Sequence, residues 1–148
     1  KEATAEVTSN LGVHAAWSGD ISGAMASYDA SKSAGGDVGN NVGILYIKLG
    51  EYDQALESFG STCTYNTALA NTLAKDLDKA KAQCDCAEKS AATSYLKAIV
   101  GARMGDVAMM GEGLKDAVSK DATYRREAMD DMEFAKYWES AEFKSAIQ

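Results

Sequence analysis

The residues that could carry out chemistry lie far apart in this sequence. The chain has a single histidine, His14, and three cysteines. His14 cannot be assigned a catalytic partner, and a histidine on an apolar helical stretch is usually structural. The segment Gly35-Gly36-Asp37 lacks the Lys-Ser/Thr that must follow in a phosphate-binding loop, and no Gly-x-Ser-x-Gly nucleophile elbow occurs. We therefore predict that the protein is not an enzyme and uses no cofactor.

The acidic run Asp130-Asp131-Met132-Glu133 could suggest a cation site. Calcium loops place their oxygen ligands at alternating positions, whereas these acids are adjacent. Zinc takes four ligands, and His14 is far in sequence from the cysteines. We therefore predict no metal site and interpret the acidic run as a solvated helix end.

The three cysteines, Cys63, Cys84 and Cys86, cannot all pair within one chain because their number is odd. In a helix the side chains of Cys84 and Cys86 would diverge by about 200°, which is too far for a relaxed bridge. Two alternatives remain open. We favour free, partly buried thiols over one bridge from Cys63 to the region of Cys84 and Cys86.

The composition indicates one folded domain that is rich in helix. The 148 residues are 46% apolar and 25% charged, which is typical of a chain that folds. The net charge of −7 argues against binding to nucleic acid or to an anionic membrane surface, because both require a basic face. No apolar run approaches the roughly 18 residues of a membrane span. The absence of proline fits long helices joined by short turns.

A short turn of similar composition recurs four times, at intervals of about 25 to 31 residues. The copies are Ser18–Ile21, Leu49–Tyr52, Ala74–Leu77 and Met104–Val107. Glycine suits the left-handed residue that ends a helix, and the acid after it suits the start of the next helix. Helical periodicity dominates between the turns. The pattern predicts helices at 2–18, 21–33, 38–49, 53–60, 65–74, 77–87, 91–104, 107–119 and 123–132.

Each predicted helix pair carries a small residue in its first helix and a bulkier residue in its second. The small residues are Gly12, Gly43, Ala68 and Ala98, and the bulkier ones are Tyr28, Phe59, Cys84 and Leu114. Small residues let paired helices approach closely, and aromatic side chains such as Tyr46 fill the space between neighbours. Phe59 is therefore expected to be buried between two repeats. Because stacked pairs need a terminal cap, we assign that role to residues 123–148.

Residues 41–59 resemble the tetratricopeptide repeat (TPR) family, which has a small residue at Gly43, aromatic residues at Tyr46 and Phe59, and alanine at Ala55. Residues 8–31, 64–87 and 94–117 are similar to weaker copies. The resemblance implies an all-α, right-handed solenoid of about four helix-turn-helix repeats in one domain, 1–148. The repeats would cover approximately 2–35, 36–62, 63–89 and 90–122, with the cap at 123–148. The chain also resembles exported TPR proteins of Gram-negative bacteria, which favours a periplasmic or exported location.

In TPR proteins the first helix of each pair lines a groove for peptides. The resemblance implies that the peptide-binding residues here are Trp17, Asn40, Ile44, Lys48, Tyr65, Tyr95 and Arg103. The alternative is that neighbouring helices or the cap cover them. The chain keeps Asn10 and Asn41 of the family's carboxylate clamp, but Glu6 and Asp37 stand where basic residues would lie. An acidic site repels a carboxylate, so we reject binding of that kind.

The function that the resemblance implies is a non-catalytic scaffold that binds a protein or peptide segment. The first 60 residues hold three basic and eight acidic side chains, which favours a neutral or basic partner whose association slows as salt rises. Trp17 is the expected anchor. The alternative function is a structural or assembly module of a larger envelope protein without a free-peptide site. The sequence indicates neither the partner nor the oligomeric state.

Overall fold

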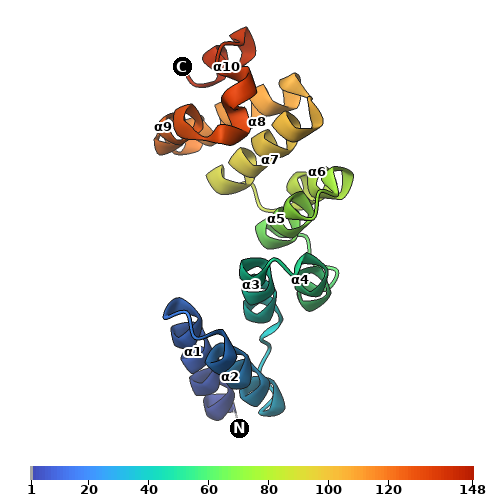
Figure 1. The fold of residues 1–148 in the computed structure, drawn as a ribbon, viewed down its shortest axis with the longest axis vertical. Helices are drawn as coiled ribbons and strands as arrows, with labels where there is room; N and C mark the ends of the chain where they lie inside the picture. The colour runs from blue at the N-terminus through green and yellow to red at the C-terminus, as the bar shows by residue number, and fades with distance from the viewer. Residues whose placement is uncertain (1) are drawn as a thin grey trace. The chain divides into compact units, whose positions relative to one another are not determined.

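The computed structural model describes the backbone from Glu2 to Gln148 and the side chains from Thr4 onward. Over this range every regular element is a helix, which confirms the predicted all-α class. The chain divides into two compact units, residues 1–61 and residues 62–148. Figure 1 shows the helices of each unit.

The first unit consists of two helical hairpins. Its helices are α1 (Glu2–Trp17), α2 (Ile21–Ser33), α3 (Gly39–Leu49) and α4 (Tyr52–Phe59). Helix α1 packs most extensively on α2, and α3 packs most extensively on α4. The core of this unit forms around Tyr28 and Leu45, with Ala24 and Val38 between them.

The second unit contains two more hairpins and a C-terminal segment. Its helices are α5 (Tyr65–Leu73), α6 (Leu77–Cys86), α7 (Ala91–Met104), α8 (Val107–Lys120), α9 (Thr123–Asp130), the 3₁₀ helix η1 (Met132–Tyr137) and α10 (Ala141–Ala146). Across both units, the ends of α1 to α8 lie within one residue of the predicted ends. The ninth predicted helix, 123–132, ends two residues earlier, at Asp130, and Asp131 instead caps the start of η1.

The four recurring turns share one backbone conformation. Their second residues, Gly19, Gly50, Lys75 and Gly105, have φ values of 83°, 78°, 65° and 76°. In each turn the N–H of the next, acidic residue donates to the carbonyl oxygen five residues earlier, at 2.9 to 3.0 Å. This is the Schellman arrangement that ends a helix. Three of the four acids, Asp20, Asp76 and Asp106, then accept a backbone N–H of the following helix at 2.8 to 3.3 Å. Glu51 makes no such side-chain bond.

The small and bulky positions of each pair are buried, as the spacing predicts. A Cβ atom on Gly12 would lie 2.5 Å from Cε1 of Tyr28, and one on Gly43 would lie 2.3 Å from Cε1 of Phe59. In the second unit, Ala68 and Cys84 share one core cluster, and Ala98 and Leu114 share another. Phe59 is buried against Gly43 within its own hairpin.

The close approach of α7 and α8 depends on two glycines. A Cβ atom on Gly101 would lie 2.6 Å from the backbone nitrogen of Met110. A Cβ atom on Gly113 would lie 2.8 Å from the backbone nitrogen of Ala98. Because the obstacles are backbone atoms, any side chain at these positions must push the two helices apart.

Replacing Gly113 with alanine is therefore expected to lower the free energy of unfolding by about 1–3 kcal/mol. Gly111, on the same helix, is the matched control, since its Cβ would meet Glu142 only at 3.9 Å. Alanine at Gly111 should instead raise the free energy of unfolding by up to about 1 kcal/mol through helix propensity. Urea denaturation followed by circular dichroism measures both, and equal effects would contradict the close approach.

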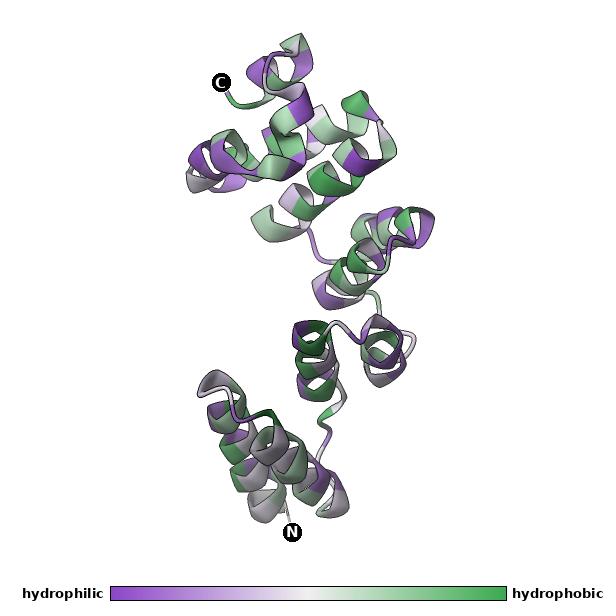
Figure 2. Ribbon diagram, viewed as in Figure 1, coloured by the Kyte–Doolittle hydropathy of each residue, from purple (hydrophilic) through white to green (hydrophobic). Residues whose placement is uncertain are grey.

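The C-terminal segment packs back onto the α7–α8 hairpin. Phe134 of η1 is fully buried, and the hydroxyl of Tyr137 donates to the carbonyl oxygen of Ala102 at 2.9 Å. Helix α10 packs on α8. Helix α9 is mostly hydrophilic in Figure 2, and Ala128 is its buried residue. Residues 123–148 thus cover an apolar face of this hairpin.

A disulfide joins Cys63 to Cys86, whose Cα atoms lie 6.0 Å apart, and Cys84 is free and buried. The favoured prediction of free thiols is therefore wrong for Cys63 and Cys86, and the alternative of one bridge from Cys63 is correct. Cys63 lies just before α5 and Cys86 ends α6, so the antiparallel hairpin brings the two together. Cys84 instead faces the core cluster of Ala68 and Val100.

Candidate functional site

Side chains from α1, α2 and α3 line a hollow in the first unit, which we call the Trp17 hollow. Its volume is about 180 Å³. The residues that line it are Val13, Ala16, Trp17, Tyr28, Asn41, Ile44, Leu45 and Lys48. Three of the predicted peptide-binding residues, Trp17, Ile44 and Lys48, are thus brought together. Asn40, a fourth, is exposed on α3 and does not line this hollow.

Trp17 is unusual because its side chain is 84% exposed at the last residue of α1. The helix stops there because the next two residues form the first of the recurring turns. Tyr28 and Leu45 are buried at the base of the hollow, and Ile44 is half-buried beside them. An exposed indole next to buried apolar residues, with the exposed Lys48 in the same lining, is typical of a contact surface.

A second hollow of the first unit contains carboxylates, and we call it the acidic hollow. Its volume is about 310 Å³, and its lining is Ala5, Glu6, Ser9, Asn10, Ser31, Gly35, Gly36 and Asp37. Glu6 and Asp37, which sequence comparison with the TPR clamp singled out, therefore lie at one site together with Asn10.

Local hydrogen bonds fix the framework around the acidic hollow. The Ser31 hydroxyl donates to the carbonyl oxygen of Ala5 at 2.7 Å and ties α2 to α1. A carboxylate oxygen of Asp37 accepts the backbone N–H of Gly39 at 3.2 Å, at the start of α3. One hydrogen bond joins the linings of the two hollows: Nδ2 of Asn41 in the Trp17 hollow donates to Oγ of Ser9 in the acidic hollow at 3.3 Å. We refer to the two hollows together as the α1–α3 groove.

The remaining predicted binding residues lie in the second unit. Tyr65 is half-buried against the cluster that contains Ala68 and Leu96. Tyr95 is buried and stacks with Tyr124 and Phe134, at ring-centroid distances of 4.7 and 5.6 Å. The C-terminal segment therefore covers Tyr95.

Arg103 is bound to the same segment. Its Nε and one terminal nitrogen donate to the two carboxylate oxygens of Glu133, at 2.9 and 2.5 Å. Its other terminal nitrogen donates to the carbonyl oxygen of Thr72 at 2.9 Å. The guanidinium lowers the pKa of Glu133 from its ordinary value. Arg103 thus links α5, α7 and η1 through three hydrogen bonds, one from each nitrogen of its guanidinium.

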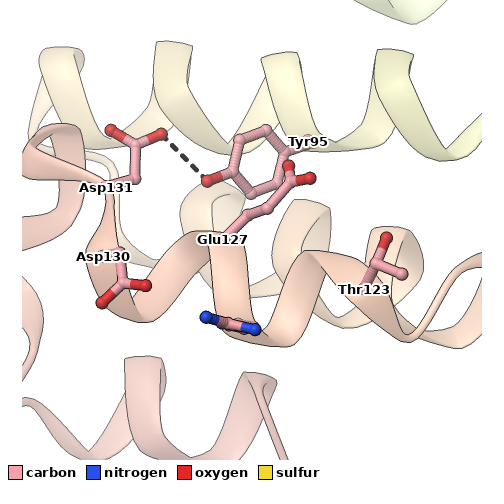
Figure 3. Close-up of a pocket in the computed structure, with 6 residues that line it drawn as sticks. Tyr95, Thr123, Glu127, Asp130 and Asp131 are labelled. Atoms are coloured by element: carbon pink, nitrogen blue, oxygen red, sulfur yellow. Dashed lines mark hydrogen bonds between the residues drawn. The ribbon is translucent and has the colours of Figure 1, made fainter.

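The hydroxyl of Tyr95 and the carboxylate of Asp131 form a polar pair at a hollow of about 530 Å³ (Figure 3). Tyr95 donates to Oδ2 of Asp131 at 2.9 Å, and Oδ1 accepts the backbone N–H of Glu133 at 2.9 Å. Burial, and then the bond to Asp131, raise the pKa of Tyr95 well above its ordinary value. The phenol therefore stays protonated and anchors the start of η1 to α7.

Sequence reasoning placed Tyr46 between neighbouring helices and missed a hollow beside it, the third in the first unit. Tyr46 is half-buried and lines a hollow of about 560 Å³ formed by α2, α3 and α4, together with Asp29, Glu57 and Val42. The acids were visible in the sequence, but their gathering depends on how α2 packs beside the second hairpin. Periodicity along one helix does not contain that information.

No protein-family model matches the chain, and searches of curated proteins and of solved structures found no match either. Within residues 2–148, no helix is both long and apolar enough to span a membrane. Among the same residues, no group of three or more His, Cys, Asp or Glu side chains is arranged to hold a metal ion.

Proposed function

We propose that the chain is a TPR-like, right-handed α-solenoid with about four helix-turn-helix repeats and a C-terminal cap at 123–148. The recurrence of one Schellman turn at four places supports this proposal. So does the burial of Ala24, Ala55, Ala80 and Met110, which occupy equivalent positions in α2, α4, α6 and α8. Single hairpins bury too little surface to be stable alone, so repeated hairpins need to stack.

The function that the site supports best is a non-catalytic scaffold, which binds a protein or peptide segment through the α1–α3 groove. The observation that carries this proposal is Trp17, which is 84% exposed beside an apolar floor. Trp is the residue type most enriched among interface residues that dominate binding energy. The net charge of −5 over the first 60 residues supports a neutral or basic partner and disfavours nucleic acid.

The polar pair of the second unit supports the non-catalytic assignment. Both carboxylate oxygens of Asp131 accept hydrogen bonds from within the unit. Oδ2 accepts from the Tyr95 hydroxyl, and Oδ1 accepts from the backbone N–H of Glu133. Two acceptor positions of the carboxylate thus hold elements of the fold together, and the Tyr95 hydroxyl is committed to Asp131. The arrangement therefore fits an anchor for the C-terminal segment.

One observation favours the alternative function, a structural module of a larger envelope protein. Tyr95 and Arg103, which the TPR resemblance assigns to a groove, bind the chain's own C-terminal segment. In that case these residues hold the C-terminal segment in place, and the chain serves assembly without a free-peptide site. The Cys63–Cys86 disulfide supports an oxidising compartment for either function, as in the periplasm or outside the cell.

The test of the proposal starts from peptides selected for binding to the full chain from a random dodecapeptide library on phage. We expect Trp17→Ala to weaken binding of a selected peptide by about 2 kcal/mol or more, because the indole supplies the main apolar contact. The melting temperature should barely change, since the side chain is mostly outside the core.

Val7→Ala is the matched control, because Val7 is an exposed apolar residue of α1 that lines neither hollow. It should leave both the affinity and the melting temperature unchanged. Unchanged affinity and a large fall in melting temperature for Trp17→Ala would instead show that Trp17 packs inside the first hairpin, and the proposal would fail.

A further inference from the structure

We infer that the α1–α3 groove selects a segment with a basic side chain about five residues away from an aromatic or large aliphatic one. The inference rests on the proposed function and adds the chemistry of the partner. The two hollows differ in what they can hold: one is apolar with an exposed indole, and the other is polar with two carboxylates.

The acidic hollow suits an ammonium or guanidinium group. Glu6 and Asp37 are exposed and come from different segments of the lining, one on α1 and one just before α3. Ser9 and Asn10 add a hydroxyl and an amide to the lining. Within the described lining there is no Lys or Arg to neutralise the two carboxylates. Lys32 lies in the adjoining hollow, which Gly36 and Asp37 also line, so within the acidic hollow itself a partner's basic side chain would supply the cation.

The Trp17 hollow suits an uncharged side chain. Val13, Ala16 and Ile44 give it an apolar lining, and Trp17 offers an indole face. Its one charged group is the Lys48 amine, which repels a second cation. The partner's basic group is thus directed to the acidic hollow and its apolar group to the Trp17 hollow, so the segment binds in one register.

The length of α1 sets the spacing of the two anchors. Glu6 and Trp17 are eleven positions apart on one helix, and a rise of ~1.5 Å per residue separates them by about 16 Å along the axis. An extended segment advances ~3.3 Å per residue, so about five residues span that distance. The hydrogen bond from Asn41 to Ser9 lies between the two ends and keeps α1 and α3 in register.

The composition of the selected peptides tests the inference. The immobilised full chain is panned with random dodecapeptides on phage, and the retained sequences are read. We expect Lys or Arg to be enriched about five positions from Trp, Phe or Leu. A synthetic peptide with the most frequent sequence should bind the double variant Glu6→Gln, Asp37→Asn about tenfold more weakly than the wild type.

The control double variant is Glu51→Gln, Asp53→Asn, which removes the same two charges from the same unit outside both hollows. Its affinity for the peptide should be within about twofold of that of the wild type, because the charges it removes lie outside the binding site and are screened by salt. Two outcomes would overturn the inference and leave the proposed peptide binding intact. One is that peptides whose binding depends on Trp17 show no enrichment of Lys or Arg. The other is that the two double variants lose the same amount of affinity. Failure to obtain any peptide that depends on Trp17 would overturn the proposed function and the inference together.

Discussion

Replacing Phe59 with alanine should lower the free energy of unfolding by about 3–5 kcal/mol, one of the two largest effects we expect. The phenyl ring is buried and fills the space that the absent side chain of Gly43 leaves on α3. Removing it creates a cavity that the hairpin cannot close by shifting one helix, because the backbone turn at Gly50 fixes the pair. Chemical denaturation followed by circular dichroism at 222 nm measures the loss.

Leu49→Ala provides the matched control for this prediction. Leu49 belongs to the same hairpin, but its side chain is exposed at the end of α3. Its truncation should cost less than about 1 kcal/mol, because little apolar surface returns to water. A loss below about 1 kcal/mol for Phe59→Ala would show that the assigned register of small and bulky positions is wrong.

Removing the disulfide is the second large effect. The double variant Cys63→Ser, Cys86→Ser opens a loop with a sequence separation of 23 residues, which should cost about 3 kcal/mol of stability. The bridge constrains the unfolded chain and ties the start of α5 to the end of α6. Thermal melts with and without dithiothreitol measure the effect.

The reductant itself supplies the control. The wild-type melting temperature should fall to that of the double variant in dithiothreitol, whereas the variant should not respond. Cys84 is not expected to replace either partner, because burial raises the pKa of its thiol to about 11 and keeps the reactive thiolate scarce at neutral pH. A wild-type melt that is insensitive to dithiothreitol would contradict a stabilising role for the bridge.

The helices could be predicted from sequence because their ends are marked locally. Gly50 and Gly105 adopt the left-handed conformation that ends a helix, and Asp20 and Asp106 accept a backbone N–H that begins the next. Each of these signals acts within a few residues. Together with the 3.6-residue periodicity, they locate the ends of α1 to α8 to within one residue.

The disulfide could also have been predicted from the positions of the helix ends. The predicted ranges already placed Cys63 before one helix and Cys86 at the end of its antiparallel partner, and such ends meet in a hairpin. The free-thiol prediction rested instead on the usual burial of unpaired cysteine, which holds here for Cys84. The burial of Cys84 on the opposite side of α6 is what leaves Cys86 as the partner.

Which of the candidate binding residues lie together could be predicted only in part. Trp17, Ile44 and Lys48 gather because α1 and α3 each present one side to the same hollow, which a helical register can anticipate. Tyr95 and Arg103 are different, because Asp131 and Glu133 reach them from the C-terminal segment. Which face a terminal segment covers depends on packing between elements distant in the sequence.

The most direct test of peptide binding through the α1–α3 groove is to map a selected dodecapeptide onto the full chain by amide chemical shifts. The largest shifts at saturation should come from residues 6–17 of α1 and residues 37–48 around α3, including the indole N–H of Trp17. The amides of α9 and η1, near the Tyr95–Asp131 pair, should not move. Shifts centred on α9 and η1, with the Trp17 indole unchanged, would contradict the account.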